Sequence, residues 1–136
     1  MDYISHCRSR RKGLTELLGI KIDCIEDGHS VISMDVKEEF LNPWGVAHGG
    51  TTYSIMDTAA GISAQYKDGK FRPLVSQSGN IHYLRPIFPG VIRAESFIIK
   101  DGSHTAVAEV KVYNCEGEMC ASGEFDLFFT GEAQIL

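Results

Sequence analysis

His48, Gly49 and Gly50 precede a stretch of sixteen residues in which Asp57 is the only charged side chain. The stretch is otherwise small, apolar or weakly polar, and it predicts a helix that is buried on nearly all sides. A buried carboxylate without a partner is costly, so such a group tends to be kept where it serves a function. The His and the two glycines supply donors at the positive end of the same helix. Donors beside an isolated carboxylate favour acyl chemistry over mere packing.

Thioester hydrolysis is a reaction that these groups suit. It develops negative charge on a carbonyl oxygen, and one backbone N–H that stabilises this charge is worth roughly 10²–10³ in rate. Asp57 fits either a nucleophile or a general base, and general-base assistance is worth roughly 10²–10⁴. A thioester is reactive enough to need no metal. The four cysteines form no Cys-x-x-Cys pair, so we expect neither a metal site nor a bound cofactor.

The spacing of the candidate groups predicts that one chain cannot complete the site. With about 1.5 Å of helical rise per residue, the Gly49 amide and the Asp57 carboxylate lie on the order of 10–12 Å apart. They cannot both touch a single carbonyl group. Two such helices that pack antiparallel across a two-fold axis would bring the start of one helix to the middle of the other. A homodimer would then hold two equivalent shared sites.

The remaining sequence predicts an α+β fold in a single domain, 1–136. Asp27-Gly28 and Asp101-Gly102 are strong hairpin signals between alternating segments. Strands are expected at residues 20–26, 30–37, 74–84, 91–100, 104–114 and 118–130. A short helix is expected within 5–18, with Leu14, Leu17 and Leu18 forming an apolar edge, and the long helix should end near 66. Helix and strands do not alternate, which argues against a doubly wound sheet. An antiparallel sheet of about six strands curled around one central helix fits best.

Composition excludes several classes of function. The chain has 136 residues and a net charge of −5, which argues against nucleic-acid binding. No segment has the features of a signal peptide or the ~20 apolar residues of a membrane helix. We therefore expect a cytoplasmic protein without nucleic-acid or membrane partners. The basic cluster of Arg8, Arg10, Arg11 and Lys12 fits a solvated helix face or a contact to a ligand phosphate.

Several motifs together resemble a known family. They are Asn42-Pro43-x-Gly45-x-x-His48-Gly49-Gly50 followed by Asp57, then Asn80-x-x-Tyr83-Leu84-Arg85-Pro86, then Gly117-x-x-x-Ala121-x-Gly123. This pattern is similar to that of the hotdog-fold acyl-CoA thioesterases of the phenylacetate-pathway type. The resemblance covers most of the chain and implies a hotdog fold and hydrolysis of an acyl-CoA to free acid and CoA.

The resemblance also implies roles for individual residues. The Gly49 amide would polarise the thioester carbonyl, and His48 would orient the ligand near the sulfur. Asn42 would hold the loop or the attacking water, and Asp57 of the partner subunit would be nucleophile or general base. Ser76 matches a water-positioning serine of a related thioesterase.

Further implications concern CoA and assembly. Gly50 and Arg85 are assigned to CoA binding, with Arg85 near the phosphates. CoA enters only as part of the substrate. Members of the family commonly form tetramers built from two dimers.

Alternatives stay open at this point. Asn42 also fits an ordinary turn, the two glycines fit backbone hinges, and Trp44 and Tyr53 fit either an acyl pocket or packing. The chain could be a non-catalytic acyl-CoA binding or sensing protein, or a hotdog dehydratase or hydratase, although the motif expected for the latter is not found. Aromatic, hydroxylated aromatic and medium-chain acyl groups all fit the sequence.

Overall fold

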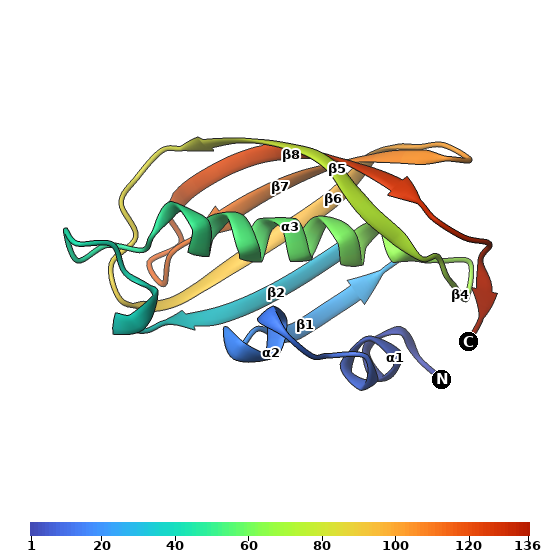
Figure 1. The fold of residues 1–136 in the computed structure, drawn as a ribbon, viewed down its shortest axis with the longest axis horizontal. Coiled ribbons are helices and arrows are strands. Elements are labelled where there is room, and N and C mark those ends of the chain that lie inside the picture. Colours follow the sequence, from blue (N-terminus) through green and yellow to red (C-terminus); the bar gives the residue numbers. More distant parts are fainter.

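The structure, a computed structural model, describes all residues from Met1 to Leu136. A six-stranded antiparallel sheet in the order β1-β2-β6-β7-β8-β5 curls around the long helix α3 (Gly49–Gln65), as Figure 1 shows. The strands are β1 (Lys21–Glu26), β2 (His29–Val36), β5 (Leu74–Tyr83), β6 (Gly90–Asp101), β7 (Thr105–Tyr113) and β8 (Met119–Phe129). The predicted α+β architecture, with one sheet around one central helix, is confirmed.

The smaller elements correct the expectation of one helix within 5–18. Gly13 has φ +66° and separates α1 (Tyr3–Ser9) from α2 (Leu14–Leu17). Of the apolar edge expected there, only Leu18 is buried, whereas Leu14 and Leu17 are exposed. The remaining elements are the 3-10 turn η1 (Glu38–Phe40) and a small sheet of β3 (Tyr66–Lys67), β4 (Lys70–Phe71) and β9 (Gln134–Ile135).

The core lies between α3 and the concave face of the sheet. Alternation in the strands supplies one side of it: every second residue of β7 from Ala106 to Val112 is buried. Three buried serines tie the helix to the sheet, because Ser30 Oγ donates to the Ala59 carbonyl at 2.8 Å and the Ser63 and Ser96 hydroxyls are 2.8 Å apart. These bonds satisfy polar groups that would otherwise be costly to bury.

One side of α3 is left open, contrary to the expectation of a helix buried nearly all round. The residues that are not buried recur at helical spacing and include Gly50, Ser54, Asp57, Gly61 and Gln65. In Figure 1, much of α3 faces the viewer with no element in front of it. The reason is that the edge strands β1 and β5 do not meet, so the sheet covers only part of the helix surface.

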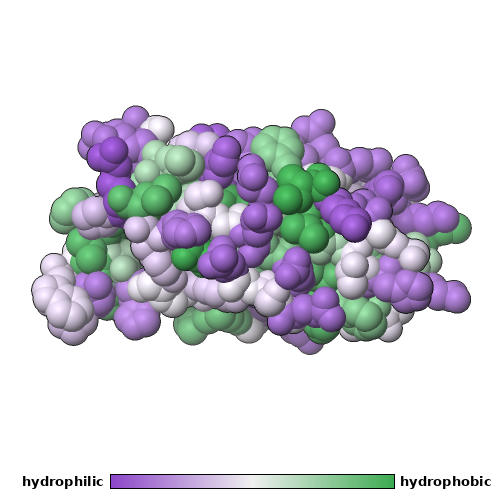
Figure 2. All heavy atoms as spheres, turned by 90° about the horizontal axis from the view of Figure 1, so that it is seen from above, coloured by the Kyte–Doolittle hydropathy of each residue, from purple (hydrophilic) through white to green (hydrophobic).

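The edge strand β5 is also unusually open. Eight of its ten residues are exposed, and the other two are half-buried. The face above β5 and β8 carries mostly hydrophilic residues, with hydrophobic ones in separate patches (Figure 2). Long exposed edges are normally blunted or covered, because their unpaired backbone groups invite pairing with another chain. The fold therefore offers two adjoining open features, the side of α3 and the edge of β5.

Candidate active site

Asp57 and Ser76 form the first part of the site. Asp57 lies on the open side of α3, and Ser76 Oγ of β5 donates a hydrogen bond to Asp57 Oδ1 at 2.5 Å. Asp57 is half-buried, so the expectation of a buried carboxylate without a partner is wrong. The turn of α3 that carries Asp57 faces β5. At this point the pairing of β5 with β8 has a register irregularity, between Ser76 and Ser78. The hydrogen bond from Ser76 holds the orientation of the carboxylate.

Both residues line a cavity of about 460 Å³, here called the Asp57 cavity. Burial raises the pKa of the Cys7 thiol and of the Tyr66 hydroxyl, which line the same cavity. Both groups are therefore neutral near pH 7, and a neutral thiol is a poor nucleophile. Asp57 is the only carboxylate among the residues that line this cavity. It is therefore the group in the cavity that is suited to act as a base.

The start of α3 forms the second part of the site. His48 is the N-cap residue, and its Nδ1 accepts a hydrogen bond from the Gly50 amide at 2.8 Å. The His48 carbonyl accepts from the Thr51 amide at 2.8 Å. Gly49 N–H has no acceptor in the chain. Only one of the two glycine amides is thus free to stabilise an oxyanion, because the histidine ring caps the other.

The free amide opens onto a separate cavity of about 530 Å³, here called the Gly49 cavity. Its lining includes Asn42, Gly49, Gly50, Tyr83 and Arg85. Tyr83 Oη donates to the Gly49 carbonyl at 2.9 Å, which fixes the peptide that follows the free N–H. The sequence motif contained Tyr83, but its role at the helix start depends on how β5 passes α3.

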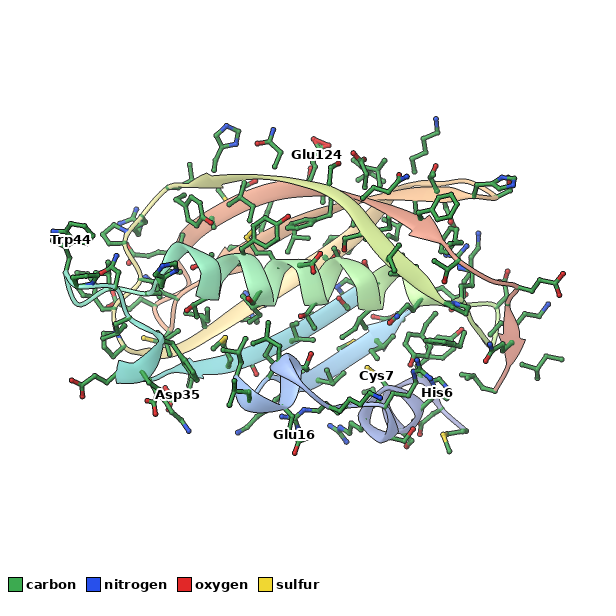
Figure 3. The ribbon with its side chains drawn as sticks, viewed as in Figure 1. His6, Cys7, Glu16, Asp35, Trp44 and Glu124 are labelled. Atoms are coloured by element: carbon green, nitrogen blue, oxygen red, sulfur yellow. The ribbon has the colours of Figure 1, made fainter.

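Asn42 and Trp44 shape the loop before the helix. Asn42 Oδ1 accepts from the Trp44 amide at 3.0 Å and from the Val46 amide at 3.3 Å, an arrangement typical of an Asx turn. Of the two roles implied for Asn42, holding the loop is the one with observed contacts. Trp44 is 83% exposed at the loop tip and lines neither cavity (Figure 3). Tyr53 packs edge-on against Phe125 with ring centroids 5.3 Å apart.

Arg85 lies at the surface beside the Gly49 cavity. Its Nη1 is 3.1 Å from Glu118 Oε2, and both side chains are substantially exposed. An exposed ion pair of this kind contributes little to stability, so the guanidinium can exchange its partner for a phosphate at small cost.

The structure keeps the two parts of the site apart within one chain. The Asp57 cavity and the Gly49 cavity share no lining residue. Eight residues along α3 separate Gly49 from Asp57, which is about 12 Å of helix. Asp57 therefore lies with Ser76 in one cavity, and Gly49 lies with Asn42 and Arg85 in the other. A single chain does not bring the free amide to the carboxylate.

One further group of side chains has metal-ligand chemistry. Ligand atoms of Cys24, Glu26 and His29 lie within 4.8 Å of one another at the β1–β2 hairpin. His29 already contacts Glu26 at 3.3 Å and Glu95 at 2.9 Å. The spacing rules for Cys and His pairs did not reveal this group, because hairpin pairing rather than a motif brings it together. None of these residues lines the Asp57 cavity or the Gly49 cavity.

Comparison with known proteins places the chain in a family. Residues 45–121 match the model of the thioesterase superfamily. A curated relative, the 1,4-dihydroxy-2-naphthoyl-CoA hydrolase of Listeria monocytogenes, is 30% identical over 100 residues, covering 74% of this chain and 81% of that protein. The chain belongs to the thioesterase superfamily, and the predicted class of thioester hydrolase is confirmed.

Solved structures show which members of the superfamily this chain resembles in fold. The Escherichia coli PaaI protein from the phenylacetic acid degradation operon superposes with a TM-score of 0.86 at 25% identity, covering 98% of this chain and 94% of that one. A Streptococcus mutans protein bound to acetyl CoA has a TM-score of 0.76 at 27% identity, covering 83% and 90%. The hotdog fold and the resemblance to PaaI-type acyl-CoA thioesterases are confirmed. None of the helices here combines the length and hydropathy of a membrane-spanning segment.

Proposed function

We propose that this chain hydrolyses an acyl-CoA thioester to a free acid and CoA in a site shared by two subunits. The observation that carries the proposal is the pair of half-sites: a free Gly49 N–H at the start of α3, and the Asp57 carboxylate held by Ser76. Antiparallel packing of two α3 helices through their open sides would join the Gly49 cavity of one subunit to the Asp57 cavity of the other. The exposed edge of β5 supports the same pairing.

The reaction follows from these two groups. The Gly49 N–H donates to the thioester carbonyl oxygen as negative charge develops on it. Asp57 acts in one of two ways. As a base it takes a proton from water while the water oxygen attacks the carbonyl carbon; the C–S bond then breaks and the CoA thiolate leaves and is protonated. As a nucleophile its oxygen attacks the carbonyl carbon, the C–S bond breaks and the CoA thiolate leaves, and water then hydrolyses the acyl-aspartyl anhydride to release the acid and the free carboxylate. Ser76 keeps the carboxylate aimed in either case.

Binding of CoA is assigned to the Gly49 cavity. Gly50 and Arg85 would contact the CoA portion, Arg85 at the phosphates, and Asn42 would hold the loop that shapes the cavity. His48, whose ring caps α3, would lie near the sulfur. The S. mutans structure with acetyl CoA and the Listeria hydrolase support an acyl-CoA substrate. We propose a small aromatic or medium-chain acyl group, a dimer-of-dimers tetramer and a cytoplasmic location.

A panel of acyl-CoA substrates with a thiol-detecting reagent tests the proposal. Asp57→Asn should lower kcat at least about a hundredfold, within the range for losing a general base. The matched control is Asp126→Asn, since Asp126 also accepts a serine hydrogen bond, from Ser78 at 2.6 Å, but lines neither cavity. Near-normal turnover in Asp57→Asn would refute the assignment. Tight acyl-CoA binding without thiol release would favour the non-catalytic binding protein instead.

A further inference from the structure

The N-terminal segment contributes cationic side chains to the lining of the Asp57 cavity. In Figure 1, α1 lies beneath the C-terminal end of α3, and Figure 3 shows Cys7 on this helix. Arg10, Arg11 and Lys12 line the cavity, with Asp57 as the one carboxylate among the lining residues. This concentration of positive charge is notable in a chain whose net charge is −5. The field inside the cavity therefore favours an anion.

Arg11 is the half-buried member of this group, and its guanidinium has no partner in the chain. Its Nε is shielded from solvent with no acceptor. Its guanidinium forms no hydrogen bond and no ion pair in the chain. Arg10, by contrast, lies over the Phe71 ring, 4.5 Å from its centroid. A shielded Nε without an acceptor is costly, and a bound carboxylate would give this guanidinium both an acceptor and a counter-charge.

The remaining walls of the cavity are a mixture of apolar and polar side chains. Ile22, Ile62 and Leu74 are among the apolar ones. A ligand suited to this lining has a thioester near Asp57, a partly apolar body, and an anionic group near the arginines. CoA phosphates fit less well, because the whole pantetheine arm separates them from the sulfur, which must lie beside Asp57 and the partner's half-site.

We propose that Arg11 makes this enzyme selective for acyl groups that end in a carboxylate, such as the monothioesters of dicarboxylic acids. This inference rests on the proposed hydrolase function and specifies its substrate class. Arg11 pairs with the distal carboxylate, while Arg10 and Lys12 add to the local positive potential. The apolar side chains of the cavity hold the methylene chain, and the thioester carbon lies at Asp57.

Matched substrates provide the test. Adipoyl and hexanoyl thioesters have the same chain length and differ in the distal carboxylate, and each is prepared on CoA and on N-acetylcysteamine, which lacks phosphates. The native chain should prefer adipoyl over hexanoyl in kcat/KM at least about tenfold on both carriers, the scale of a hydrogen bond to a charged group. Arg11→Gln should abolish this preference, because kcat/KM for the adipoyl thioesters falls much more than kcat/KM for the hexanoyl thioesters. Arg93→Gln, at an arginine that packs on Tyr113 outside both cavities, should keep the preference.

Other outcomes would overturn the assignment. The absence of an adipoyl preference in the native chain would refute it. A second contrary result would be a fall of kcat/KM in Arg11→Gln that is equal for adipoyl-CoA and hexanoyl-CoA and absent for the cysteamine thioesters, because Arg11 would then bind CoA phosphate. Dissociation of the oligomer in Arg11→Gln, measured by sedimentation velocity, would make Arg11 a subunit contact instead.

A binding measurement separates this proposal from the hydrolase itself. Isothermal titration of the full chain should show adipate binding more tightly than hexanoate, and Arg11→Gln should remove the difference. If no thioester is hydrolysed but adipate still binds through Arg11, the anion site stands and the hydrolase function fails. If adipate binds no better than hexanoate, the anion site fails, whatever the turnover.

Discussion

Replacing the free amide of Gly49 isolates the contribution of a single N–H. Gly49→Pro removes this hydrogen while keeping a residue that is favoured at the first position of a helix. The preceding residue, His48, has φ −58° and ψ 140°, the extended conformation that a following proline requires. The perturbation therefore deletes a donor with little change in the backbone.

The side chain of the variant needs its own control. A Cβ at Gly49 would lie 3.3 Å from Tyr83 Oη, a tight contact that shifts the tyrosine slightly. Gly49→Ala introduces the same Cβ and keeps the N–H. Comparing proline with alanine therefore cancels the contact and leaves the donor as the main difference.

The expected magnitude is that of one oxyanion donor, roughly 10²–10³ in kcat or about 2.7–4 kcal/mol. Steady-state hydrolysis of the best acyl-CoA, with thiol release as the signal, measures kcat and KM for both variants, and thermal unfolding checks that both are folded. Because the donor acts mainly in the transition state, kcat should fall more than KM rises. If folded Gly49→Pro stays within a fewfold of Gly49→Ala, the role assigned to this amide is wrong.

Three other changes have defined outcomes. Ser76→Ala should lower kcat about tenfold without loss of folding, because the candidate base loses the hydrogen bond that aims it; unchanged kcat would remove the serine from the site. Gly123→Ala should lower the free energy of unfolding in urea by about 3 kcal/mol, because a Cβ there would lie 2.5 Å from a backbone carbonyl oxygen of β5; a stable variant would contradict this packing. Burial pushes the pKa of Asp101 up, but hydrogen bonds from Lys67 and Arg72 outweigh it and hold the pKa below its usual range. The folded state is therefore stabilised above about pH 4, and this contribution is lost as the pH falls further. Asp101→Asn should cost more stability in urea at pH 7 than at pH 3, and an equal cost at both would refute the linkage.

The sequence predicted most of the fold because its signals are local. Asp27-Gly28 and Asp101-Gly102 mark the two hairpins, and alternating side chains marked the strands between them to within a few residues. The break at Gly13 was missed because Leu14 and Leu17 suggested a continuous apolar edge, whereas both are exposed. Helical spacing alone does not show which face a neighbouring element covers.

The candidate site could be predicted only in part for the same reason. Gly49 and Asp57 stand out by residue type and by their spacing on one helix. The Ser76–Asp57 hydrogen bond depends on how β5 passes α3, and the His48 cap depends on a side-chain conformation that no motif encodes. The partnerless guanidinium of Arg11 emerges only when the N-terminal segment is placed against α3.

A mixing experiment tests most directly whether two chains share each site. Gly49→Pro and Asp57→Asn chains, each inactive alone, are unfolded, mixed in equal amounts and refolded together. Random pairing makes half of the dimers mixed, and each mixed dimer regains one of its two sites, so activity should return to about a quarter of that of the native chain. No recovery, with mixed dimers shown to be present, would mean that the amide and the carboxylate act within the same chain.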